Sequence, residues 1–161
     1  MNKIIFLLLI IFCSSCTTTY YIVRHAEKEA AAPNMTSDVE LSSVGKQRAE
    51  ALKSELGNKK IKEIFSTNTV RTKATAQPLS DLLGLPIQVY DAKDSTFVSK
   101  IKSGEKGNVL IVGHSNTVDD LVNQFLNTKQ LSDLPDTQYG DIFIIKRKKN
   151  NYILSTGHFG N

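Results

Sequence analysis

Residues 17–28 read TTTYYIVRHAEK, an apolar, β-branched and aromatic run that stops abruptly at Arg24 and His25. The composition of the run predicts a buried strand. In parallel α/β sheets, ligands bind outside the carboxyl ends of the strands, so a strand that ends in Arg and His predicts a site for an anion. Phosphate is the obvious candidate.

The sequence on either side of this stretch predicts alternating strands and helices. Helical spacing of apolar residues runs from a cap at Ser42 or Ser43 to Gly57, with Gly45 packed closely on a neighbour, and from Val70 to Gly84, with a kink near Ala74 caused by Pro78. Further strands are predicted at residues 61–66, 87–90 and 109–112. A short helix is predicted at residues 97–101 and a longer one at residues 118–126. The last two strands, residues 141–148 and 152–158, are expected to form a hairpin that turns at Asn150-Asn151. The fold class is therefore α/β: a three-layer sandwich with a mostly parallel central sheet, helices on both faces and a C-terminal antiparallel hairpin.

The N-terminus differs in composition from the rest of the chain. Lys3 precedes nine apolar residues, Ile4 to Phe12, a run too short to span a bilayer but suited to the core of a signal peptide. We expect a signal peptide at residues 1–15 and one domain at residues 16–161. With 40% hydrophobic and 22% charged residues, this length is ordinary for a single globular domain.

The two cysteines, Cys13 and Cys16, lie at the end of this apolar run. Ser14 and Ser15 before Cys16 resemble the lipobox of bacterial lipoproteins, which implies acylation of Cys16 and cleavage before it. Cys13 stands where that motif usually has an aliphatic residue, so ordinary secretion and an uncleaved anchor stay open. We expect an exported, membrane-anchored lipoprotein that faces the periplasm or the cell surface.

The net charge of +4 is only mildly basic. The one dense basic cluster, Lys146 to Lys149, is interpreted as a solvated hairpin tip, with a membrane-surface or nucleic-acid patch as the alternative. No aromatic residue interleaves with it to stack bases, so no nucleic-acid partner is expected.

Three predicted strands end in polar groups. These are Arg24-His25, Ser66-Thr67 with Arg71 one turn later, and Gly113-His114 before a helix N-terminus. Because the strand ends share one edge of the sheet, two guanidiniums, two imidazoles and a helix N-terminus converge on a pocket suited to a dianionic phosphate.

These residues resemble the histidine phosphatase superfamily, the phosphoglycerate-mutase-like phosphatases. Arg24-His25-Ala26-Glu27 is similar to its R-H-x-E signature. Further similar segments are Asp38-x-x-Leu41-Ser42-x-x-Gly45-x-x-x-Ala49, Phe65-Ser66-Thr67 with Arg71 and Thr75-Ala76, and Val109 to His114. Ser115 stands where acid phosphatases of the second branch carry Asp, which favours a small branch 1 type.

The resemblance implies that His25 is the nucleophile and accepts the phosphoryl group as phosphohistidine. Arg24, Arg71 and His114 would bind the phosphoryl oxygens, and nearby arginines would help keep His25 neutral. Lys28 and Asn116, beside the two histidine motifs, are expected to add substrate contacts. No metal and no cofactor is required. His158, outside any matching motif, is interpreted as structural.

A proton donor for the leaving group is less clearly indicated. Family members that cleave alkyl phosphates have a Glu or Asp after the third strand, and residues 91–95 offer two carboxylates there without the usual Glu-containing motif. Asp94 is the first choice and Asp91 its rival. The alternative is that Asp94 only caps the helix that begins near Ser95.

The predicted function is a lipid-anchored extracytoplasmic phosphatase for phosphomonoesters or phosphohistidine-type phosphoramidates. Its partners would be a phosphorylated small molecule or a phosphoprotein, together with the membrane that holds its lipid. Mutase activity is not expected, since an exported protein would not meet glycolytic intermediates. The alternative is a lipoprotein that binds phosphate without turnover. The substrate and the oligomeric state stay open.

Overall fold

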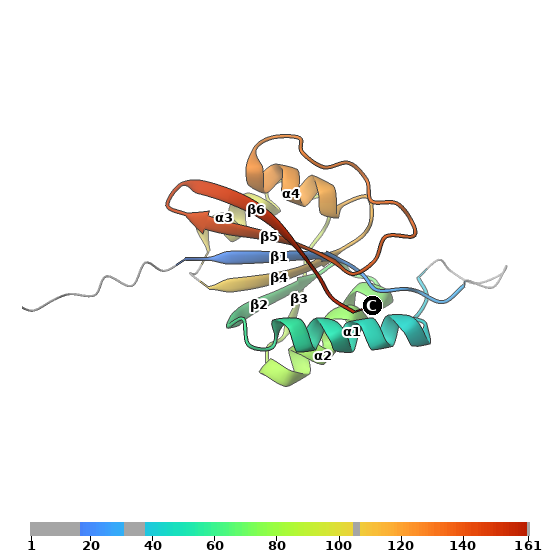
Figure 1. Ribbon diagram of the computed structural model, residues 1–161. Coiled ribbons are helices and arrows are strands. Elements are labelled where there is room, and N and C mark those ends of the chain that lie inside the picture. Colours follow the sequence, from blue (N-terminus) through green and yellow to red (C-terminus); the bar gives the residue numbers. More distant parts are fainter. Residues whose placement is uncertain (1–16, 31–37, 105–106, 161) are drawn as a thin grey trace, which may run out of the picture.

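The computed structural model describes residues 17–30, 38–104 and 107–160 (Figure 1). The predicted signal peptide and Cys16 lie outside these described residues. Within them the chain alternates strands and helices as the sequence predicts. In order, the elements are β1 (Thr19–Arg24), α1 (Ser43–Leu56), β2 (Ile61–Ser66), α2 (Val70–Leu83), β3 (Ile87–Val89), α3 (Phe97–Ser103), β4 (Asn108–Gly113), α4 (Val118–Leu126), β5 (Asp141–Lys148) and β6 (Asn151–His158).

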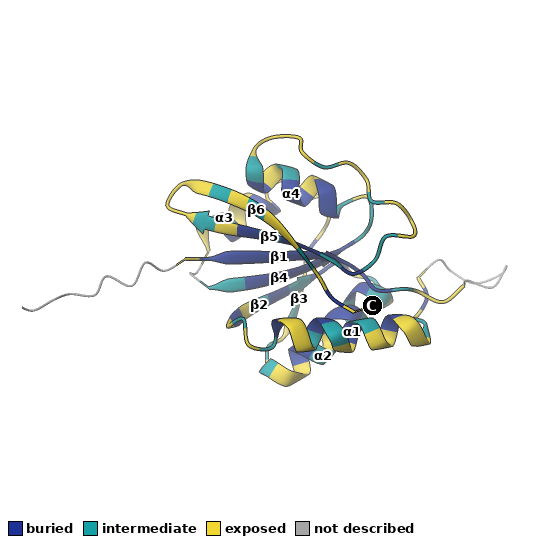
Figure 2. Cartoon of the chain, viewed as in Figure 1, coloured by how far each residue is buried: buried dark blue, intermediate teal, exposed yellow. Residues whose placement is uncertain are grey.

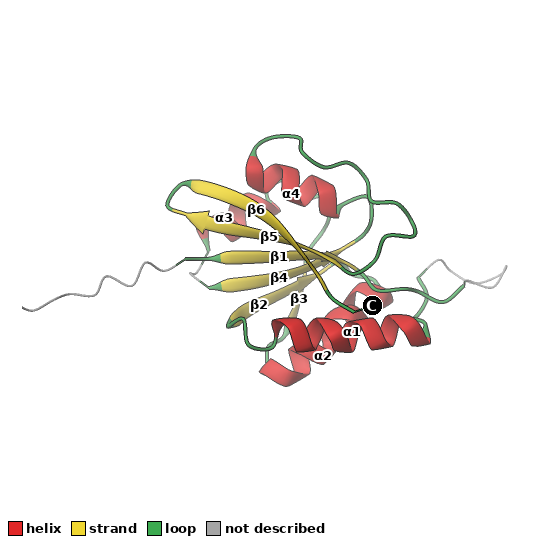
Figure 3. Ribbon diagram, viewed as in Figure 1, coloured by secondary structure: helices red, strands yellow, loops and turns green. Residues whose placement is uncertain are grey.

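The strands form one mixed sheet in the order β3-β2-β4-β1-β5-β6 (Figure 3). Pairs among β1, β2, β3 and β4 are parallel, whereas β5 pairs antiparallel with both β1 and β6. This confirms the predicted α/β fold and its C-terminal antiparallel hairpin. The predicted hairpin turn was wrong by one residue: Lys148 pairs with Asn151, so the loop is Lys149-Asn150, and Lys149 takes the positive φ of 56°.

Helices cover both faces of the sheet. α1 and α2 pack on one face and α3 and α4 on the other, and each pair has its own apolar core (Figure 1). Every residue of β1 is buried, and β4 is buried from Val109 to Gly113 (Figure 2). Such continuous apolar runs suit strands that are covered on both sides, and each fully buried Val, Leu or Ile contributes about 1.5–3 kcal/mol.

The start of α1 fixes the loop that follows β1. Ser42 caps the helix by accepting a hydrogen bond from the Gly45 amide at 3.1 Å, and Gly57 follows its last residue. A Cβ at position 45 would lie 2.0 Å from the Glu27 carbonyl oxygen, which confirms the close packing expected of Gly45. The cap and this contact hold α1 against the turn that carries His25.

Two further features are the hydrophobicity of the helices and the exposure of the hairpin tip. Over the part of the chain that the structure describes, no helix has both the length and the apolar character needed to cross a bilayer. At the hairpin tip, Lys146, Lys148 and Lys149 are exposed, while Arg147 is half-buried and donates to the Lys102 carbonyl oxygen at 2.9 Å. The tip is thus largely solvated.

Candidate active site

Three strand ends meet at one edge of the sheet. Arg24 is level with Gly113 in the pairing of β1 and β4, and Ser66 is level with Val112 in the pairing of β2 and β4. The next residues, His25, Thr67 and His114, therefore leave the sheet side by side. The structure brings together the groups that the sequence placed there.

His25 is buried, with 4% of its surface exposed. Its amide donates to the Gly113 carbonyl oxygen at 2.9 Å, and its Nδ1 lies 2.7 Å from the Ala26 carbonyl oxygen. Because a carbonyl oxygen only accepts, Nδ1 carries the proton. The neutral ring then has its lone pair on Nε2, which is the nitrogen available to attack phosphorus.

The charge state of His25 follows from its surroundings. The pKa of His25 is lowered from 6.5 to about 4, mainly by burial and also by Arg71, His114 and Arg24, while the bond to Ala26 acts in the opposite direction. The ring is therefore neutral at pH 7. A neutral imidazole is the form that a nucleophile requires.

The turn of His25 is also attached to α2. The Ala26 amide donates to Thr75 Oγ1 at 2.9 Å, and that hydroxyl donates to the Arg71 carbonyl oxygen at 2.8 Å. One threonine thus joins the turn that holds the histidine to the helical turn that holds the second arginine.

His114 sits at the end of β4 and contacts groups from the region around α2. Its Nε2 lies 2.9 Å from Thr67 Oγ1, and its Nδ1 lies 3.3 Å from Arg71 Nη2. Burial, then Arg71 and Arg24, lower the pKa of His114 to about 4, while Asp38 acts in the opposite direction. Its ring centroid is 5.4 Å from that of His25.

Arg71 stands in the first turn of α2, between an imidazole and a carboxylate. Its Nη1 lies 3.3 Å from Asp38 Oδ1, and the same oxygen accepts from the Val70 amide at 2.9 Å. Asp38 thereby serves the start of α2 and positions the guanidinium beside His114. The family resemblance included Asp38, but no residue pattern indicated its contact with Arg71.

Arg24 is directed mainly at the loop between α4 and β5. Its Nη1 lies 2.8, 3.2 and 3.0 Å from the carbonyl oxygens of Pro135, Asp136 and Gln138, and its guanidinium stacks 4.1 Å from the Tyr139 ring centroid. Its Nε is buried and, within the described residues, has no hydrogen-bond partner. Arg24 therefore holds this loop beside His25.

Glu27 of the signature motif has a structural partner that the sequence analysis missed. Arg48 on α1 pairs with it at 2.7 Å and also donates to the Phe159 carbonyl oxygen at 3.0 Å. Glu27 and Arg48 thus join the His25 turn, α1 and the segment after β6. The helical spacing of Arg48 from Gly45 carried no information on this contact.

Lys28 and Asn116 stand near the two histidines in sequence, and both are exposed. Lys28 forms an isolated β-bridge with Leu41, and Asn116 lies in the turn between β4 and α4. Their contacts with a substrate stay a prediction.

Asp94 makes the contacts of a helix-capping residue. Its Oδ1 accepts from the Thr96 amide at 2.8 Å, and its Oδ2 pairs with Lys100 Nζ at 2.9 Å. Hydrogen bonds from Thr96, and then from Lys100, hold the pKa of Asp94 to about 2. A carboxyl group in this state has no proton to give near neutral pH, so these contacts favour the capping interpretation over proton donation.

A hollow of about 320 Å³ opens beside His114. Thr67 and Asn68 line one side, and residues 89–93, including Asp91, line the other. Asp94 lines a neighbouring hollow of about 340 Å³ together with Phe65 and Phe97. Of the two candidate donors, only Asp91 borders the space next to His114.

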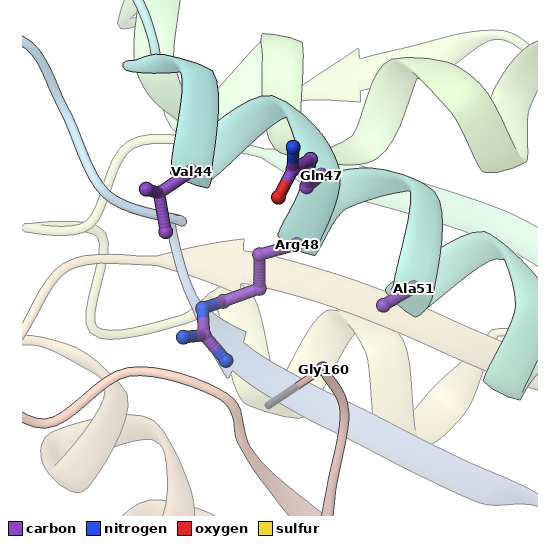
Figure 4. Close-up of a pocket in the computed structure, with 5 residues that line it drawn as sticks. All are labelled: Val44, Gln47, Arg48, Ala51 and Gly160. Atoms are coloured by element: carbon purple, nitrogen blue, oxygen red, sulfur yellow. The ribbon is translucent and has the colours of Figure 1, made fainter.

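Another hollow, of about 360 Å³, lies along α1 (Figure 4). Val44, Gln47, Arg48, Ala51 and Gly160 line it, and Arg48 crosses the space between α1 and the segment that carries Gly160. The histidines and Arg71 do not line it. It is a separate feature from the hollow beside His114.

Comparison with protein families gives a match over residues 20–93 to the histidine phosphatase superfamily, branch 1. This match includes the strand that ends in Arg24-His25 and the helix that carries Arg71. The match covers 74 of the 161 residues, and over that stretch the chain is similar to the histidine phosphatase superfamily. This similarity supports a phosphatase, although the superfamily also includes mutases. No curated protein sequence matches the chain.

Solved structures share the fold. The putative phosphohistidine phosphatase SixA from Agrobacterium tumefaciens is 20% identical, with a TM-score of 0.67 over 89% of this chain and 97% of that one. A protein histidine phosphatase SixA complexed with tungstate is 18% identical, with a TM-score of 0.68 over 87% and 96%. A mycobacterial glucosyl-3-phosphoglycerate phosphatase is 15% identical, with a TM-score of 0.66 over 89% and 100%.

The described residues also bear on metal binding. Across residues 17–30, 38–104 and 107–160, no group of three or more His, Cys, Asp or Glu side chains is placed to hold a metal ion. The groups around His25 and His114 are mainly imidazoles, guanidiniums and hydroxyls, with the Asp38 carboxylate beside Arg71.

Proposed function

We propose that this chain is a metal-independent phosphatase that passes the phosphoryl group from a monoester or phosphoramidate to His25 and then to water. One observation carries the proposal. The bond from His25 Nδ1–H to the Ala26 carbonyl oxygen leaves the lone pair on Nε2 of a buried, neutral ring beside Arg71 and His114. That arrangement is the one a phosphoryl acceptor needs.

The reaction has two balanced steps. In the first, Nε2 forms a bond to phosphorus while the bond from phosphorus to the leaving oxygen or nitrogen breaks, and the leaving group takes up a proton. In the second, water attacks the phosphohistidine, the N–P bond breaks, and phosphate departs after losing a proton to solvent. The sum is hydrolysis of the phosphate compound.

Positive charge beside the nucleophile supports this chemistry. A loose phosphoryl-transfer transition state spreads charge over the equatorial oxygens, and the guanidiniums of Arg71 and Arg24 lie close enough to both histidines to act on that charge. Among the solved structures that share the fold, one SixA is named a putative phosphohistidine phosphatase and another a protein histidine phosphatase.

The capping contacts of Asp94 bear on the substrate. Alkoxides are poor leaving groups and need a proton donor, whereas phenolates and protonated imidazoles leave readily. We therefore propose that the preferred substrates are those with good leaving groups, such as phosphohistidine, whose imidazole departs when the N–P bond breaks. Asp91, at the edge of the hollow beside His114, is the remaining candidate donor for alkyl phosphates.

The test is a substrate panel with the purified full chain in detergent and without added metal. We expect hydrolysis of p-nitrophenyl phosphate and phosphoramidate, slower hydrolysis of an alkyl phosphate, and an acid-labile, base-stable phosphoenzyme in quenched reactions. Phosphate binding without any turnover would overturn the enzyme and favour the alternative of a binding lipoprotein.

We also propose that Cys16 carries a lipid that anchors the protein outside the cytoplasm. The signal-like run before Cys16 supports this proposal. Cys16→Ser should abolish labelling by a fatty-acid analogue and release the protein from membranes, with Cys13→Ser as the matched control. Lipid on the Cys16→Ser protein, or none on the unchanged protein, would refute the anchor.

A further inference from the structure

The Thr67 hydroxyl stands behind His114, and its hydrogen bonds have a determined direction. Thr67 is buried, with 6% of its surface exposed. It donates to Thr72 Oγ1 at 3.1 Å, and Thr72 donates back to the Thr67 carbonyl oxygen at 2.9 Å. Each hydroxyl has only one proton, so Thr67 Oγ1 can only accept from His114 Nε2, 2.9 Å away.

The contact of the other ring nitrogen, Nδ1 of His114, indicates the same tautomer. Arg71 Nη2 lies 3.3 Å from His114 Nδ1, and a guanidinium only donates. Nδ1 is therefore an acceptor. His114 carries its proton on Nε2, which faces Thr67, and its lone pair on Nδ1, which faces Arg71 and the phosphate pocket.

We propose that Thr67, supported by Thr72, is a positioning residue that holds His114 in this tautomer, so that binding of a dianionic phosphoryl group is coupled to the capture of one proton at Nδ1. The inference rests on the proposed phosphate pocket. It goes beyond that pocket because it assigns a role to Thr67 and a proton to the binding step.

The coupling follows from electrostatics. A lone pair on Nδ1 repels a phosphoryl oxygen, whereas an N–H at that position donates to it. The charged groups that face His114 are Arg71 and Arg24, which oppose protonation, and Asp38, which favours it; the neighbouring His25 ring is neutral. Two negative charges arriving on the ligand add to the effect of Asp38 and favour the imidazolium. The proton comes from solvent.

The tautomer can be measured without any turnover. Nitrogen-15 shifts of the imidazole rings at pH 7 should show the proton on Nε2 in His114 and on Nδ1 in His25. Thr67→Val should move His114 toward the Nδ1–H form, and Thr67→Ser should restore the unchanged spectrum. Thr69→Val is the matched control, because the Thr69 hydroxyl bonds Thr72 at 2.8 Å but not His114.

The proton can be counted with sulfate, a dianion that does not titrate near pH 7. Calorimetric titrations in two buffers of different ionisation enthalpy should show uptake of about one proton. Uptake should persist in His25→Asn and disappear in His114→Asn. Thr67→Val should weaken sulfate binding about tenfold, a loss of about 1.4 kcal/mol, and Thr67→Ser should not.

Each result decides a different part of the proposal. An Nδ1–H tautomer of His114 in the unchanged protein, or a tautomer unaffected by Thr67→Val, would overturn the role of Thr67. Sulfate binding without proton uptake, or no sulfate binding, would overturn the coupling. Hydrolysis of p-nitrophenyl phosphate in the same preparation would show that the proposed function survives either failure.

Discussion

The turns after β1 and β4 are built alike but present opposite nitrogens. Each follows a central parallel strand, each carries a histidine, and in both the surroundings lower the pKa to about 4. His25 donates a hydrogen bond from Nδ1–H to the Ala26 carbonyl oxygen. In the inferred tautomer, His114 donates one from Nε2–H to the Thr67 hydroxyl. In the proposed reaction one ring attacks phosphorus and the other receives a proton, so the hydrogen-bond partner behind each ring would determine its function.

The largest effect separates the two histidines. His25→Ala should remove the phosphoenzyme and lower turnover about 10³-fold or more, because no other group can take the phosphoryl transfer. His114→Ala should slow the reaction but still accumulate labelled phosphoenzyme in a quenched-flow experiment. His158→Ala, at the exposed histidine that pairs with Asp141, is the control and should stay near full activity. Loss of phosphoenzyme in His114→Ala alone would reverse the assignment.

The free energy of unfolding should depend on pH through the two histidines, His25 and His114. The folded pKa of His25 lies near 4, below its ordinary value of 6.5, so the unfolded chain binds more protons between these values. The free energy of unfolding should therefore be largest above pH 6.5 and fall as the pH drops toward 4, by about 3 kcal/mol for His25. The more exposed His114 should contribute less. Urea unfolding at pH 7 and 4.5 measures the change.

Comparison with His25→Asn isolates this contribution from those of the carboxylates. The variant should lose less stability between pH 7 and pH 4.5 than the unchanged protein does. If both proteins lose the same stability between pH 7 and pH 4.5, the fold does not hold His25 neutral. The two turns would then not share a histidine with a lowered pKa.

Arg71 contacts the His114 side of the site. Arg71→Ala should lower kcat/KM about 10²-fold, because its charge acts on both the bound and the reacting phosphoryl group. Arg71→Lys should not rescue activity, since an ammonium cannot bond Asp38 and His114 with the geometry of a planar guanidinium. Steady-state kinetics with p-nitrophenyl phosphate measures both. Full rescue by lysine would reduce the role of Arg71 to that of a point charge.

The smallest effect is expected at Asp94, which touches neither histidine turn. Asp94→Asn should change hydrolysis of p-nitrophenyl and alkyl phosphates alike and less than about twofold, because the contacts of its carboxylate are those of a cap on α3. Kinetics on the two substrates checks this. A selective loss with the alkyl phosphate would restore Asp94 as the proton donor.

Sequence predicted the elements of this fold well because their signals are local. Buried parallel strands have continuous apolar sequences, as in β4. The ends of α1 are indicated by a cap at Ser42 and a glycine at position 57. The hairpin turn was misplaced by one residue because Asn150-Asn151 has typical turn composition, while the pairing register places Lys149 at the positive φ.

The site was predictable only in part. His25, Arg71 and His114 stand at strand ends or in first helical turns, where chain order indicates position. Tyr139 and the carbonyl groups that hold Arg24 lie in a loop without periodicity, more than a hundred residues away along the chain, and backbone carbonyls leave no trace in a sequence. The ring tautomers depend on the direction of single hydrogen bonds, which no residue pattern encodes.

The bonds of Arg24 to that loop have a consequence for how activity is acquired during folding. They span 111 to 115 residues, and the bond from Ala26 to Thr75 spans 49. Contacts of such sequence separation form late and slowly, since long stretches of chain must be ordered before they close. His25, the proposed nucleophile, is synthesised early, but its surroundings are completed only when the segment after α4 docks. A chain stalled before that point would contain His25 without a catalytic centre, so refolding should regain secondary structure before phosphatase activity.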